Sequence, residues 1–578
     1  MTGVLDAGPV APARRKQWEL RPAPSAADVG ALETLLTLPT GLCQLLVVRG
    51  LSDPEAAKAW LRPALEHLRP PETLPGMADA VARLDRAIAQ RERILVHGDY
   101  DVDGICATTL LVSVLRELGG EAEPFIPHRL TDGYDLGAAG VSAAQRLGAT
   151  LVLTCDCGTS ALEPIAALHA SGIDVIVSDH HLPGGPLPAC VAVLSPKHPD
   201  ARDADPDLVA VGVAFQLARA LYRARQLPES RAHRHLDLVA LATVADVGAL
   251  RGDNRILVRH GLKRMAAKAR VGLDALLRSS GLADKPLSAG RLAFTLAPRL
   301  NAAGRIDAAM RGVELLLEPE AERAREGAEA LERLNERRQE LDRSTLAEAR
   351  AQAAQRVDAG AMGLVLHGPW HAGVVGIVAS RIVEEFGRPA VLVAMDGATG
   401  KGSGRSIGSF DLHHALGECR DLLLRFGGHR AAAGVTVAEG QLEAFAERFD
   451  AVARARLTAD DLVPVLKADL ELPLSAITRD MAHYLQYGEP WGVANPTPVF
   501  VTRGVALRGA PRVLKGEHLK LTVDDGASGL DAIGFRLGGL ASVVAQAHAV
   551  DLAYQVELDH WNGRERVQLK LVDVRPSA

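Results

Sequence analysis

Aspartate and histidine side chains follow four apolar runs in the first half of the chain. The first run ends in "HGDYDVDG" at 97–104, which holds His97, Asp99, Asp101 and Asp103. The other three groups are Asp156 in "LTCDCG", Asp179-His180-His181 in "VIVSDHH", and Asp246 in "LATVADVGAL". Carboxylate oxygens combined with imidazole nitrogens suit Mn²⁺ or Mg²⁺ and disfavour a metal bound by thiolates. The residue types therefore indicate a divalent metal site.

Two interpretations of these acidic side chains compete. A single carboxylate at the end of a strand is more often the N-cap of the next helix than a metal ligand. Several carboxylates directed at one crevice would repel one another, however, unless cations lay among them. Two ions bridged by a shared carboxylate would stabilise the attacking and the leaving oxygen of a phosphoryl displacement. The combination favours this chemistry. For Asp99 we favour a capping or supporting role, with direct ligation as the alternative.

The segments that carry these residues alternate between strand-like and helix-like patterns. From about 76 to 250, apolar runs such as "RILVHGD" and "IDVIVSD" are separated by helical stretches such as "ICATTLLVSVLREL". This alternation is typical of a parallel sheet covered by helices. Ligands bind outside the carboxyl ends of the strands in such sheets, so the four groups are expected to meet in one crevice.

We expect an α/β fold with several domains. The predicted segments are an N-terminal part that is partly mobile (1–75), a catalytic parallel-sheet domain (76–275), a helical connector (276–360), a second α/β domain (361–455) and a C-terminal β-barrel (463–578). The connector includes a long, largely solvated helix over 319–357, where charges of both signs alternate and prolines stop after Pro319. In the tail, Asn562-Gly563 separates two alternating runs, which is a strong hairpin signal.

Composition excludes some classes of protein. The chain has 578 residues, of which 48% are hydrophobic and 24% charged, and no apolar run approaches the roughly 18 residues of a membrane span. Six scattered cysteines and no apolar leader argue against a secreted disulfide scaffold, so we expect a cytoplasmic protein. The net charge of −6 provides no general attraction for a polyanion. A nucleic-acid partner would therefore need a local basic patch.

A candidate basic patch lies at 254–270, a run that contains no acidic residue. Arg255, Arg259 and Lys263 are spaced at i, i+4 and i+8, which places them on one face of a helix. A solvated face is the simpler interpretation of an isolated run. Close to a phosphoesterase site, a surface that contacts DNA phosphates becomes the better one.

A Gly/Ser-rich loop, "GKGSGRSIGS", forms a second candidate contact region with Arg405 and Ser406. Its backbone N–H groups could hold an anion while the arginine contacts it, although an ordinary flexible turn is equally consistent with the composition. Trp561, at the tail hairpin, could stack on a base, although a single exposed aromatic residue is more often incidental.

The motifs together resemble the DHH phosphoesterase superfamily. "DYDVDG", "CDCG", "SDHH" and "ATVADV" look like its four motifs, in the same order. "WHAGVVGIVASRI", "GSGRSI" and "FGGHRAAAG" are similar to the DHH-associated domain. "APRLNAAGRI" and "YGEPWGVANPTPVF" resemble segments of the RecJ family of bacterial single-stranded-DNA exonucleases, and the tail corresponds to an OB-like domain. The resemblance covers the chain from about residue 50 to 578.

This resemblance implies specific roles for the site residues. One ion would be held by His97, Asp101 and Asp156, and the other by Asp103, Asp156, His180 and Asp246, so that Asp156 bridges two divalent ions, Mn²⁺ or Mg²⁺. His181 would contact the scissile phosphate or assist proton transfer. The implied DNA contacts outside the basic run are Arg299, Asn301, Arg305, Arg405, Ser406, Gly428 and His429. For the first three, packing at the end of a helix is the simpler interpretation.

The resemblance also implies an activity and partners. The chain would degrade single-stranded DNA 5′ to 3′ to nucleoside 5′-monophosphates in recombination and repair, as a monomer working with the single-stranded-DNA-binding protein and a repair helicase. One rival is a DHH enzyme for short oligonucleotides, cyclic dinucleotides or pyrophosphate, which would not need the basic run or the barrel. A second rival is a non-catalytic DNA-binding scaffold, which the complete set of acids and histidines disfavours.

Overall fold

The computed structural model describes residues 16–129, 131–526, 528–561 and 564–577. The chain divides into two compact units. One of them, the catalytic unit, comprises residues 63–339 and 490–496, and the other comprises 1–62, 340–489 and 497–578. No helix of the described residues is both long enough and apolar enough to cross a bilayer.

The catalytic unit is built on a parallel sheet of five strands in the order β3-β2-β4-β5-β6. These are β2 (Arg93–Gly98), β3 (Glu121–Phe125), β4 (Leu151–Cys155), β5 (Asp174–Ser178) and β6 (Ala192–Leu194). All four pairings are parallel, which confirms the predicted sheet. The register pairs Gly98 with Cys155, so the segments that follow β2 and β4 leave the same edge side by side.

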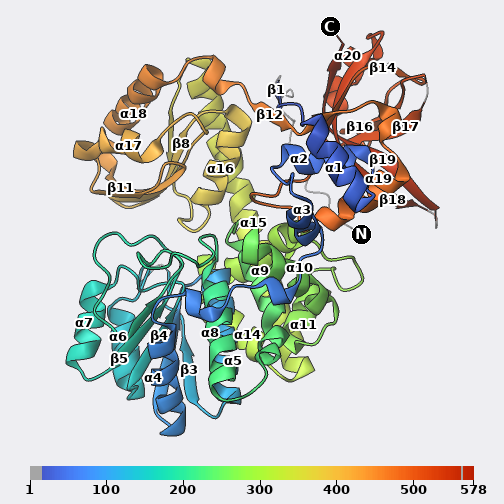
Figure 1. The fold of residues 1–578 in the computed structure, drawn as a ribbon. Coiled ribbons are helices and arrows are strands. Elements are labelled where there is room, and N and C mark those ends of the chain that lie inside the picture. Colours follow the sequence, from blue (N-terminus) through green and yellow to red (C-terminus); the bar gives the residue numbers. More distant parts are fainter. Residues whose placement is uncertain (1–15, 130, 527, 562–563, 578) are drawn as a thin grey trace. The chain divides into compact units, whose positions relative to one another are not determined.

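Helices cover both faces of this sheet (Figure 1). Ile94 and Val96 of β2 pack with helices α4 (Met77–Ala89), α5 (Val102–Glu117) and α8 (Ala210–Ala224). Leu95, which points to the other face because side chains alternate along a strand, packs with α6 (Ala138–Leu147) and α7 (Leu162–Ala170). A sheet buried on both sides explains why its strands are continuously apolar.

A further group of helices extends the same core. It consists of α9 (Leu236–Ala245), α10 (Gly252–Ala266), α11 (Val271–Ser279), α12 (Ala289–Arg291), a π-helix (Leu292–Leu296), α13 (Ala297–Ile306) and α14 (Met310–Leu317). Buried Leu296, Leu300 and Leu316 join the core of the sheet. Residues 276–317, expected in a connector, thus belong to the catalytic unit. The long helix predicted over 319–357 is observed as α15 (Ala321–Asp358).

The second α/β domain has a mixed sheet in the order β10-β11-β9-β8-β7. Its strands are β7 (Leu364–Gly368), β8 (Ala390–Asp396), β9 (Thr399–Arg405), β10 (Arg425–Gly428) and β11 (Ala432–Ala438). Only β7 and β8 are parallel, and the other pairings are antiparallel. Helix α16 (Val375–Phe386) packs on one face, and α17 (Leu412–Gly417) and α18 (Leu442–Arg456) pack on the other.

The C-terminal strands form the predicted barrel. They are β14 (Phe500–Leu507), β16 (His518–Asp524), β17 (Gly529–Gly534), β18 (Val550–Trp561) and β19 (Arg564–Pro576). Strand β14 pairs with both β16 and β18, which closes the sheet, and β17 runs parallel to β19 as in an OB-fold. Strands β18 and β19 are antiparallel out to Trp561 and Arg564, as the hairpin signal predicts. Asn562, Gly563 and the side chain of Trp561 lie outside the described residues.

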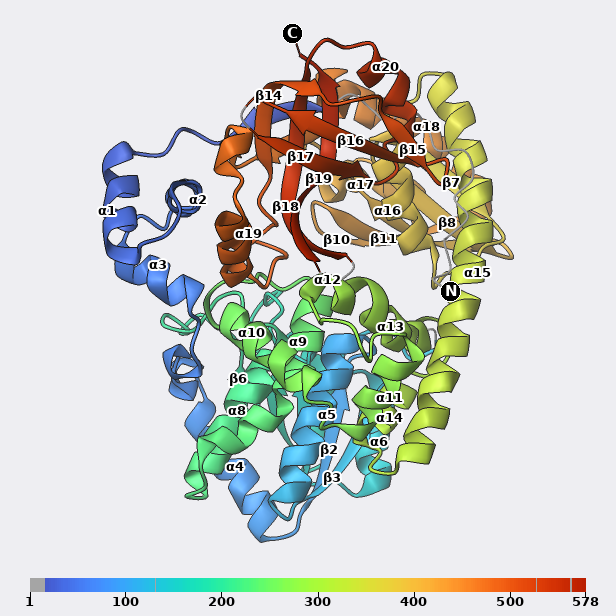
Figure 2. The same ribbon diagram turned by 90° about the vertical axis from the view of Figure 1, so that its right-hand side faces the viewer.

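The N-terminal segment differs from the expectation of a separate, partly mobile region. Strand β1 (Gln17–Leu20) runs parallel to β12 (Val465–Ala468), and Trp18 Nε1 donates to Asp573 Oδ2 at 2.8 Å. Helix α2 (Thr40–Val48) lies beside α1 (Ala26–Leu36) (Figure 2), and its Leu42 and Leu45 belong to the core of the barrel. Strand β1 and helix α2 are therefore packed with the C-terminal part of the chain, whereas residues 1–15 lie outside the description.

Candidate metal centre

The loop after β2 is held against the start of α5. Asp101 is the N-cap of α5, and its Oδ1 accepts from the N–H groups of Asp103 (2.8 Å) and Gly104 (3.2 Å). A Cβ on Gly104 would lie 2.3 Å from the carbonyl oxygen of Asp99, so only glycine permits this approach. Asp101 is therefore a helix N-cap, as one of the two interpretations predicts. This cap fixes the acidic loop at the carboxyl edge of the sheet.

Asp103 is completely buried at the first turn of α5. Its two carboxylate oxygens accept from the N–H groups of Ala210 and Val211, both at 2.8 Å. These N–H groups open α8, whose helix dipole also favours a negative charge at this position. The carboxylate is therefore fixed in orientation before any ligand binds.

Asp156 lies in a strained backbone conformation directly after β4. Its φ of 65° is in the left-handed region, which non-glycine residues seldom adopt and which is concentrated at functional sites. The side chain is only 2% exposed, and its Oδ1 has no hydrogen-bond partner among the described residues. The backbone turn directs this carboxylate inward, where a polar atom without a partner is costly.

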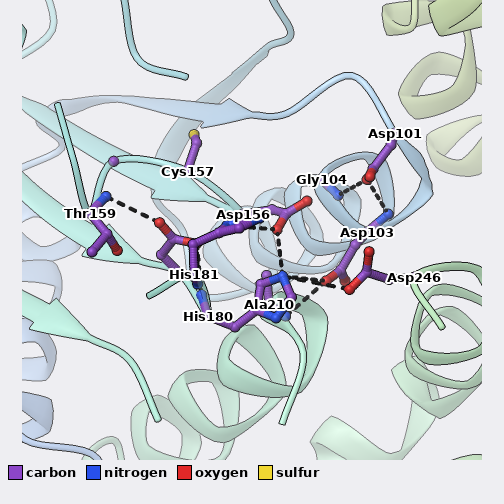
Figure 3. A network of polar contacts seen from close by, with 12 residues as sticks. Asp101, Asp103, Gly104, Asp156, Cys157, Thr159, His180, His181, Ala210 and Asp246 are labelled. Atoms are coloured by element: carbon purple, nitrogen blue, oxygen red, sulfur yellow. Dashed lines mark hydrogen bonds and ion pairs between the residues drawn. The ribbon is translucent and has the colours of Figure 1, made fainter. Parts of the chain in front are cut away.

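His180 connects the three acidic segments (Figure 3). Its Nε2 lies 3.1 Å from Asp156 Oδ1, 3.6 Å from Asp246 Oδ2 and 4.0 Å from Asp103 Oδ2. Asp103, His180 and Asp246 each offer a ligand atom within 4.8 Å of the others. This arrangement brings together all four residues that the resemblance assigns to one ion.

Two further groups of ligand atoms contain Asp156, again within 4.8 Å of one another: one has His180 and His181, and the other has Asp99 and Asp101. Asp99 is 3% exposed, and its Oδ1 has no hydrogen-bond partner in the described part of the chain. The carboxylate of Asp99, for which two roles remain open in the sequence, thus lies inside the cluster. Asp156 is common to these last two groups, and His180 links it to Asp103 and Asp246.

His97 occupies a different position from the other predicted ligands. Its ring is fully buried, its Nδ1 lies 3.5 Å from Cys157 Sγ, and a Cβ on Gly140 would lie 2.7 Å from its Nε2. Within the described residues, His97 belongs to none of the groups of close ligand atoms. The sequence-based placement of His97 beside Asp101 and Asp156 therefore stays a prediction that this geometry does not support.

Burial and mutual repulsion act against ionisation of the cluster. Desolvation, then the charge of Asp101, raises the pKa of Asp246 to about 7, and the same two causes raise the pKa of Asp99 to about 8. Burial and neighbouring carboxylates also hold the pKa values of Asp103 and Asp156 well above the usual range. Burial lowers the pKa of His180 to about 4, which leaves its imidazole neutral and able to act as a ligand. A divalent cation fits this set of hard oxygen and imidazole donors.

Asp179 and Tyr134 hold His181 beside the cluster. Asp179 Oδ1 lies 2.7 Å from His181 Nδ1, its Oδ2 accepts from the N–H of Thr159 at 3.1 Å, and the Tyr134 hydroxyl lies 3.2 Å from His181 Nε2. Burial opposes protonation of His181, but the hydrogen bond and charge of Asp179 outweigh it and raise its pKa to about 9. The sequence pattern identifies His181 but reveals nothing of Tyr134, which lies on a separate loop.

The predicted phosphate-contacting face of α10 is not a single exposed face. Arg255 is 2% exposed, Arg259 is half-buried and Lys263 is exposed. Exposure thus rises along one face of the helix, from its first turns to its end; elsewhere α10 packs closely on α9, where a Cβ on Gly261 would lie 2.2 Å from the carbonyl oxygen of Leu236. This placement corrects the expectation for Arg255, whose side chain belongs to the interior, and leaves Lys263 as the exposed member.

The predicted DNA contacts on α13 have unequal surroundings. Arg299 forms a bidentate ion pair with Glu332, through Nε (2.5 Å) and Nη2 (2.9 Å), which supports the packing interpretation. Asn301 and Arg305 are half-buried. Residue 304 is a glycine whose Cβ would lie 2.3 Å from the carbonyl oxygen of Tyr100, so the end of α13 touches the acidic loop.

One exposed aromatic residue is not among the sequence-based candidates. Phe294 is 86% exposed and lies on the π-helix that precedes α13. π-helical turns are uncommon and are often found at functional sites. The only signal in the sequence is an aromatic residue close to "APRLNAAGRI", which does not distinguish it from a core residue.

The four predicted contacts in the second α/β domain lie close together. Arg405 ends β9 and pairs in register with Ala432, while Gly428 on β10 pairs with Ala433. Arg405 Nη1 donates to Ser403 Oγ at 2.9 Å, and Ser406 Oγ donates to the carbonyl oxygen of Phe410 at 2.8 Å. His429 is exposed at the adjoining turn. The structure therefore brings these residues to one end of three neighbouring strands.

The parallel sheet with its acidic edge defines a DHH phosphoesterase. The sequence model of the DHH family, N-terminal domain, matches residues 93–243, that of the DHHA1 domain matches 358–455, and that of the RecJ OB domain matches 468–573. The single-stranded-DNA-specific exonuclease RecJ of Dickeya dadantii is 39% identical over 562 residues, which are 93% of this chain and 96% of that protein. The chain belongs to the RecJ family of single-stranded-DNA-specific exonucleases.

Other relatives agree with this assignment. RecJ of Bacillus subtilis is 34% identical over 98% of this chain and 71% of its own length. The crystal structure of RecJ from Thermus thermophilus in complex with Mn²⁺ superposes with a TM-score of 0.84 at 34% identity, covering 97% of this chain and 80% of that one. A structure of the same protein in complex with Mg²⁺ gives a TM-score of 0.77. The similarity to RecJ seen in the motifs is thereby confirmed.

Proposed function

We propose that this chain is a metal-dependent exonuclease that hydrolyses single-stranded DNA from the 5′ end to nucleoside 5′-monophosphates. The observation that carries the proposal is the cluster of Asp103, Asp156, His180 and Asp246 at the edge of a parallel sheet, in a chain of the RecJ family. Relatives named as single-stranded-DNA-specific exonucleases support the choice of substrate.

The cluster accommodates two divalent ions in this proposal. Asp103, Asp156, His180 and Asp246 hold one ion, Asp101 and Asp156 hold the other with Asp99 beside them, and His97 is the ligand that the family pattern adds. Bound ions supply Lewis-acid stabilisation of the phosphoryl group and a reactive water at neutral pH. Asp156, which lies 3.1 Å from His180 and also belongs to the group with Asp99 and Asp101, sets the distance between the ions in this proposal.

The residues around the cluster orient the reacting phosphate. Asp179 fixes the ring of His181 through Nδ1, and Nε2 is then the atom that can contact a phosphate oxygen or pass a proton. The Tyr134 hydroxyl beside Nε2 limits the positions that the ring can adopt. His181 is the catalytic residue of this pair, and Asp179 is a positioning residue.

The DNA strand is held by residues outside the cluster. Lys263, Asn301 and Arg305 contact phosphates in the catalytic unit, with Phe294 available to stack on a base. In the other unit the contacts are Arg405, Ser406, Gly428 and His429, together with the barrel. We also propose that the protein acts in the cytoplasm as a monomer, with the single-stranded-DNA-binding protein and a repair helicase as partners.

An end-labelled substrate tests the activity and separates it from its rivals. With Mn²⁺, a long 5′-labelled single strand should release labelled mononucleotide at once, whereas a 3′-labelled strand should shorten gradually. EDTA should stop both reactions. Immediate release from the 3′ end would contradict the polarity. Hydrolysis of only cyclic dinucleotides or pyrophosphate would favour the small-substrate rival, and binding without any hydrolysis would favour the scaffold.

A further inference from the structure

A polar cavity lies in the catalytic unit, at the ends of helices α5 and α9 that are opposite to the acidic cluster. It has a volume of about 420 Å³, within the range of small-molecule sites. Glu117 in the last turn of α5 and His235 at the start of α9 line it, whereas Asp103 and Asp246 lie at the other ends of these helices. Glu117 lies fourteen positions after Asp103 on α5, which corresponds to about 21 Å along the helix axis. We call this cavity the arginine pocket, after Arg234, Arg264 and Arg270, which line it.

Positive charge exceeds negative charge in the arginine pocket. Arg234 Nη1 pairs with Glu117 Oε2 at 3.0 Å, and Arg270 Nε pairs with Asp237 Oδ2 at 3.0 Å. The two carboxylates thus each have an arginine, and Arg264 is the third cation of the lining. Its Nε is buried without a hydrogen-bond partner in the described part of the chain. A buried donor of this kind favours an acceptor from outside the protein.

His235 supplies a second donor without a partner. The residue is 3% exposed, and its Nδ1 lies 3.1 Å from Arg270 Nη2. Because a guanidinium can only donate, Nδ1 must accept, and the neutral ring then carries its hydrogen on Nε2. Burial, followed by the charges of Arg270, Arg234 and Arg264, lowers the pKa of His235 to about 3, so the ring is neutral. Nε2 is buried and lacks a partner within the described residues.

We propose that the arginine pocket binds the phosphate group of a small molecule, with Arg264 Nε and His235 Nε2 as donors. Phosphate oxygens accept the charge-assisted hydrogen bonds that guanidinium groups donate, and the excess positive charge matches an anion. Two sources share this chemistry, inorganic phosphate and a nucleoside 5′-monophosphate. The second source rests on the proposed function, because such monophosphates are its products. Neither requires the acidic cluster.

Isothermal titration calorimetry of the full chain in EDTA tests this proposal. EDTA removes the cations that would hold phosphate at the acidic cluster, so binding there does not contribute. The injected compounds are inorganic phosphate, deoxyadenosine 5′-monophosphate and deoxyadenosine. We expect binding of one or both phosphate compounds and none of the nucleoside. Binding of the monophosphate alone would identify the nucleotide as the source, and equal binding of both would show that free phosphate suffices.

Matched arginine variants locate the binding. Arg264→Gln should weaken phosphate binding at least about tenfold, the loss of one charge-assisted hydrogen bond. Arg278→Gln removes the same charge from an exposed side chain on α11 outside the lining and should leave the affinity unchanged. If circular dichroism shows that Arg264→Gln does not fold, Arg234→Gln replaces it and should also weaken phosphate binding at least about tenfold. No binding by wild type at millimolar concentration, binding of deoxyadenosine alone, or equal affinity in the pocket variant would overturn the proposal.

Discussion

Asp156 has three structural features that lower stability and that are typical of functional residues. It is buried, its backbone is left-handed, and its Oδ1 lacks a hydrogen-bond partner in the described structure. Strain of this kind costs about 1–3 kcal/mol and persists only where the surrounding structure enforces it. The sequence predicts the importance of Asp156 from its position after an apolar run. It could not predict the backbone conformation, which depends on the neighbouring strand because the Asp156 N–H donates to the carbonyl oxygen of Ser178.

Two substitutions at Asp156 separate the roles of its charge and its backbone. Asp156→Asn removes the charge but keeps a side chain that tolerates a positive φ, so the rate of DNA cleavage should fall on the order of 10³-fold while the fold persists. Asp156→Ala should lose activity equally and also unfold at a lower temperature than the asparagine variant, because alanine is less suited to this φ. The measurements are cleavage rates with Mn²⁺ and thermal melts in EDTA. Near-normal cleavage by either variant would refute the bridging assignment.

Asp179 is predicted to act through His181 rather than on the substrate. Asp179→Asn should lower kcat about 10²-fold with little change in KM, since the ring of His181 loses its charged partner while the DNA contacts remain. Tyr134→Phe is the matched control, because it removes one hydroxyl from the same ring and should cost far less. Steady-state kinetics on single-stranded DNA provide both constants. An unchanged kcat in Asp179→Asn would show that the pair is only structural.

For helix α10, the sequence predicts which side chains share a face but not which of them are buried. The spacing of Arg255, Arg259 and Lys263 correctly implies a shared direction on a helix, but spacing alone does not reveal which direction faces the interior. The apolar residues Ile256, Leu257 and Val258 follow one another without a period, so no apolar stripe marks the buried side. The three side chains differ in exposure although they share a face, because the start of α10 is buried in the folded chain and its end is not.

The unequal burial of Arg255 and Lys263 predicts different effects for these two basic residues. Lys263→Ala should weaken binding of single-stranded DNA and reduce the slope of log K against log salt by about one unit, without loss of stability. Arg255→Ala should instead lower the thermal midpoint, because it removes a buried side chain. Fluorescence anisotropy across a salt series, with a melt for each variant, distinguishes them. A reduced salt slope with a normal melt for Arg255→Ala would restore the original interpretation.

Because strand β1 pairs with β12, we predict that the N-terminal segment stabilises the unit that contains the barrel. Trp18 donates to Asp573 and lies under the guanidinium of Arg575, 4.1 Å from the ring centroid. Trp18→Ala should therefore lower the thermal midpoint of the unit that contains the barrel, through a loss of about 2 kcal/mol. Glu19→Ala, on the exposed side of the same strand, is the control and should change it little. Equal melts for both variants would contradict this role. The sequence did not predict this strand, because the prolines close to β1 favour an irregular segment.

Over the whole molecule, the sequence predicts the kinds of domain better than their limits. The parallel sheet, the long helix, the second α/β domain and the barrel are all observed, because each has a strong local pattern. Residues 276–317 and 16–62 were misplaced, because their membership depends on long-range packing of Leu296, Leu300, Leu42 and Leu45 into cores built elsewhere in the chain. The meeting of the acidic segments was predictable for a similar reason, since four local motifs carry their side chains. His97 shows the limit of this reasoning.

The central claim is that the acidic cluster is a two-ion centre on which DNA hydrolysis depends. The most direct measurement is equilibrium dialysis of Mn²⁺ with the metal-free chain, combined with the rate of mononucleotide release from 5′-labelled single-stranded DNA at each Mn²⁺ concentration. We predict two bound ions per chain and a rate that follows occupancy of both. In Asp156→Asn, both the stoichiometry and the rate should fall. Full activity with no bound ion, or two ions bound equally tightly by Asp156→Asn, would contradict the account.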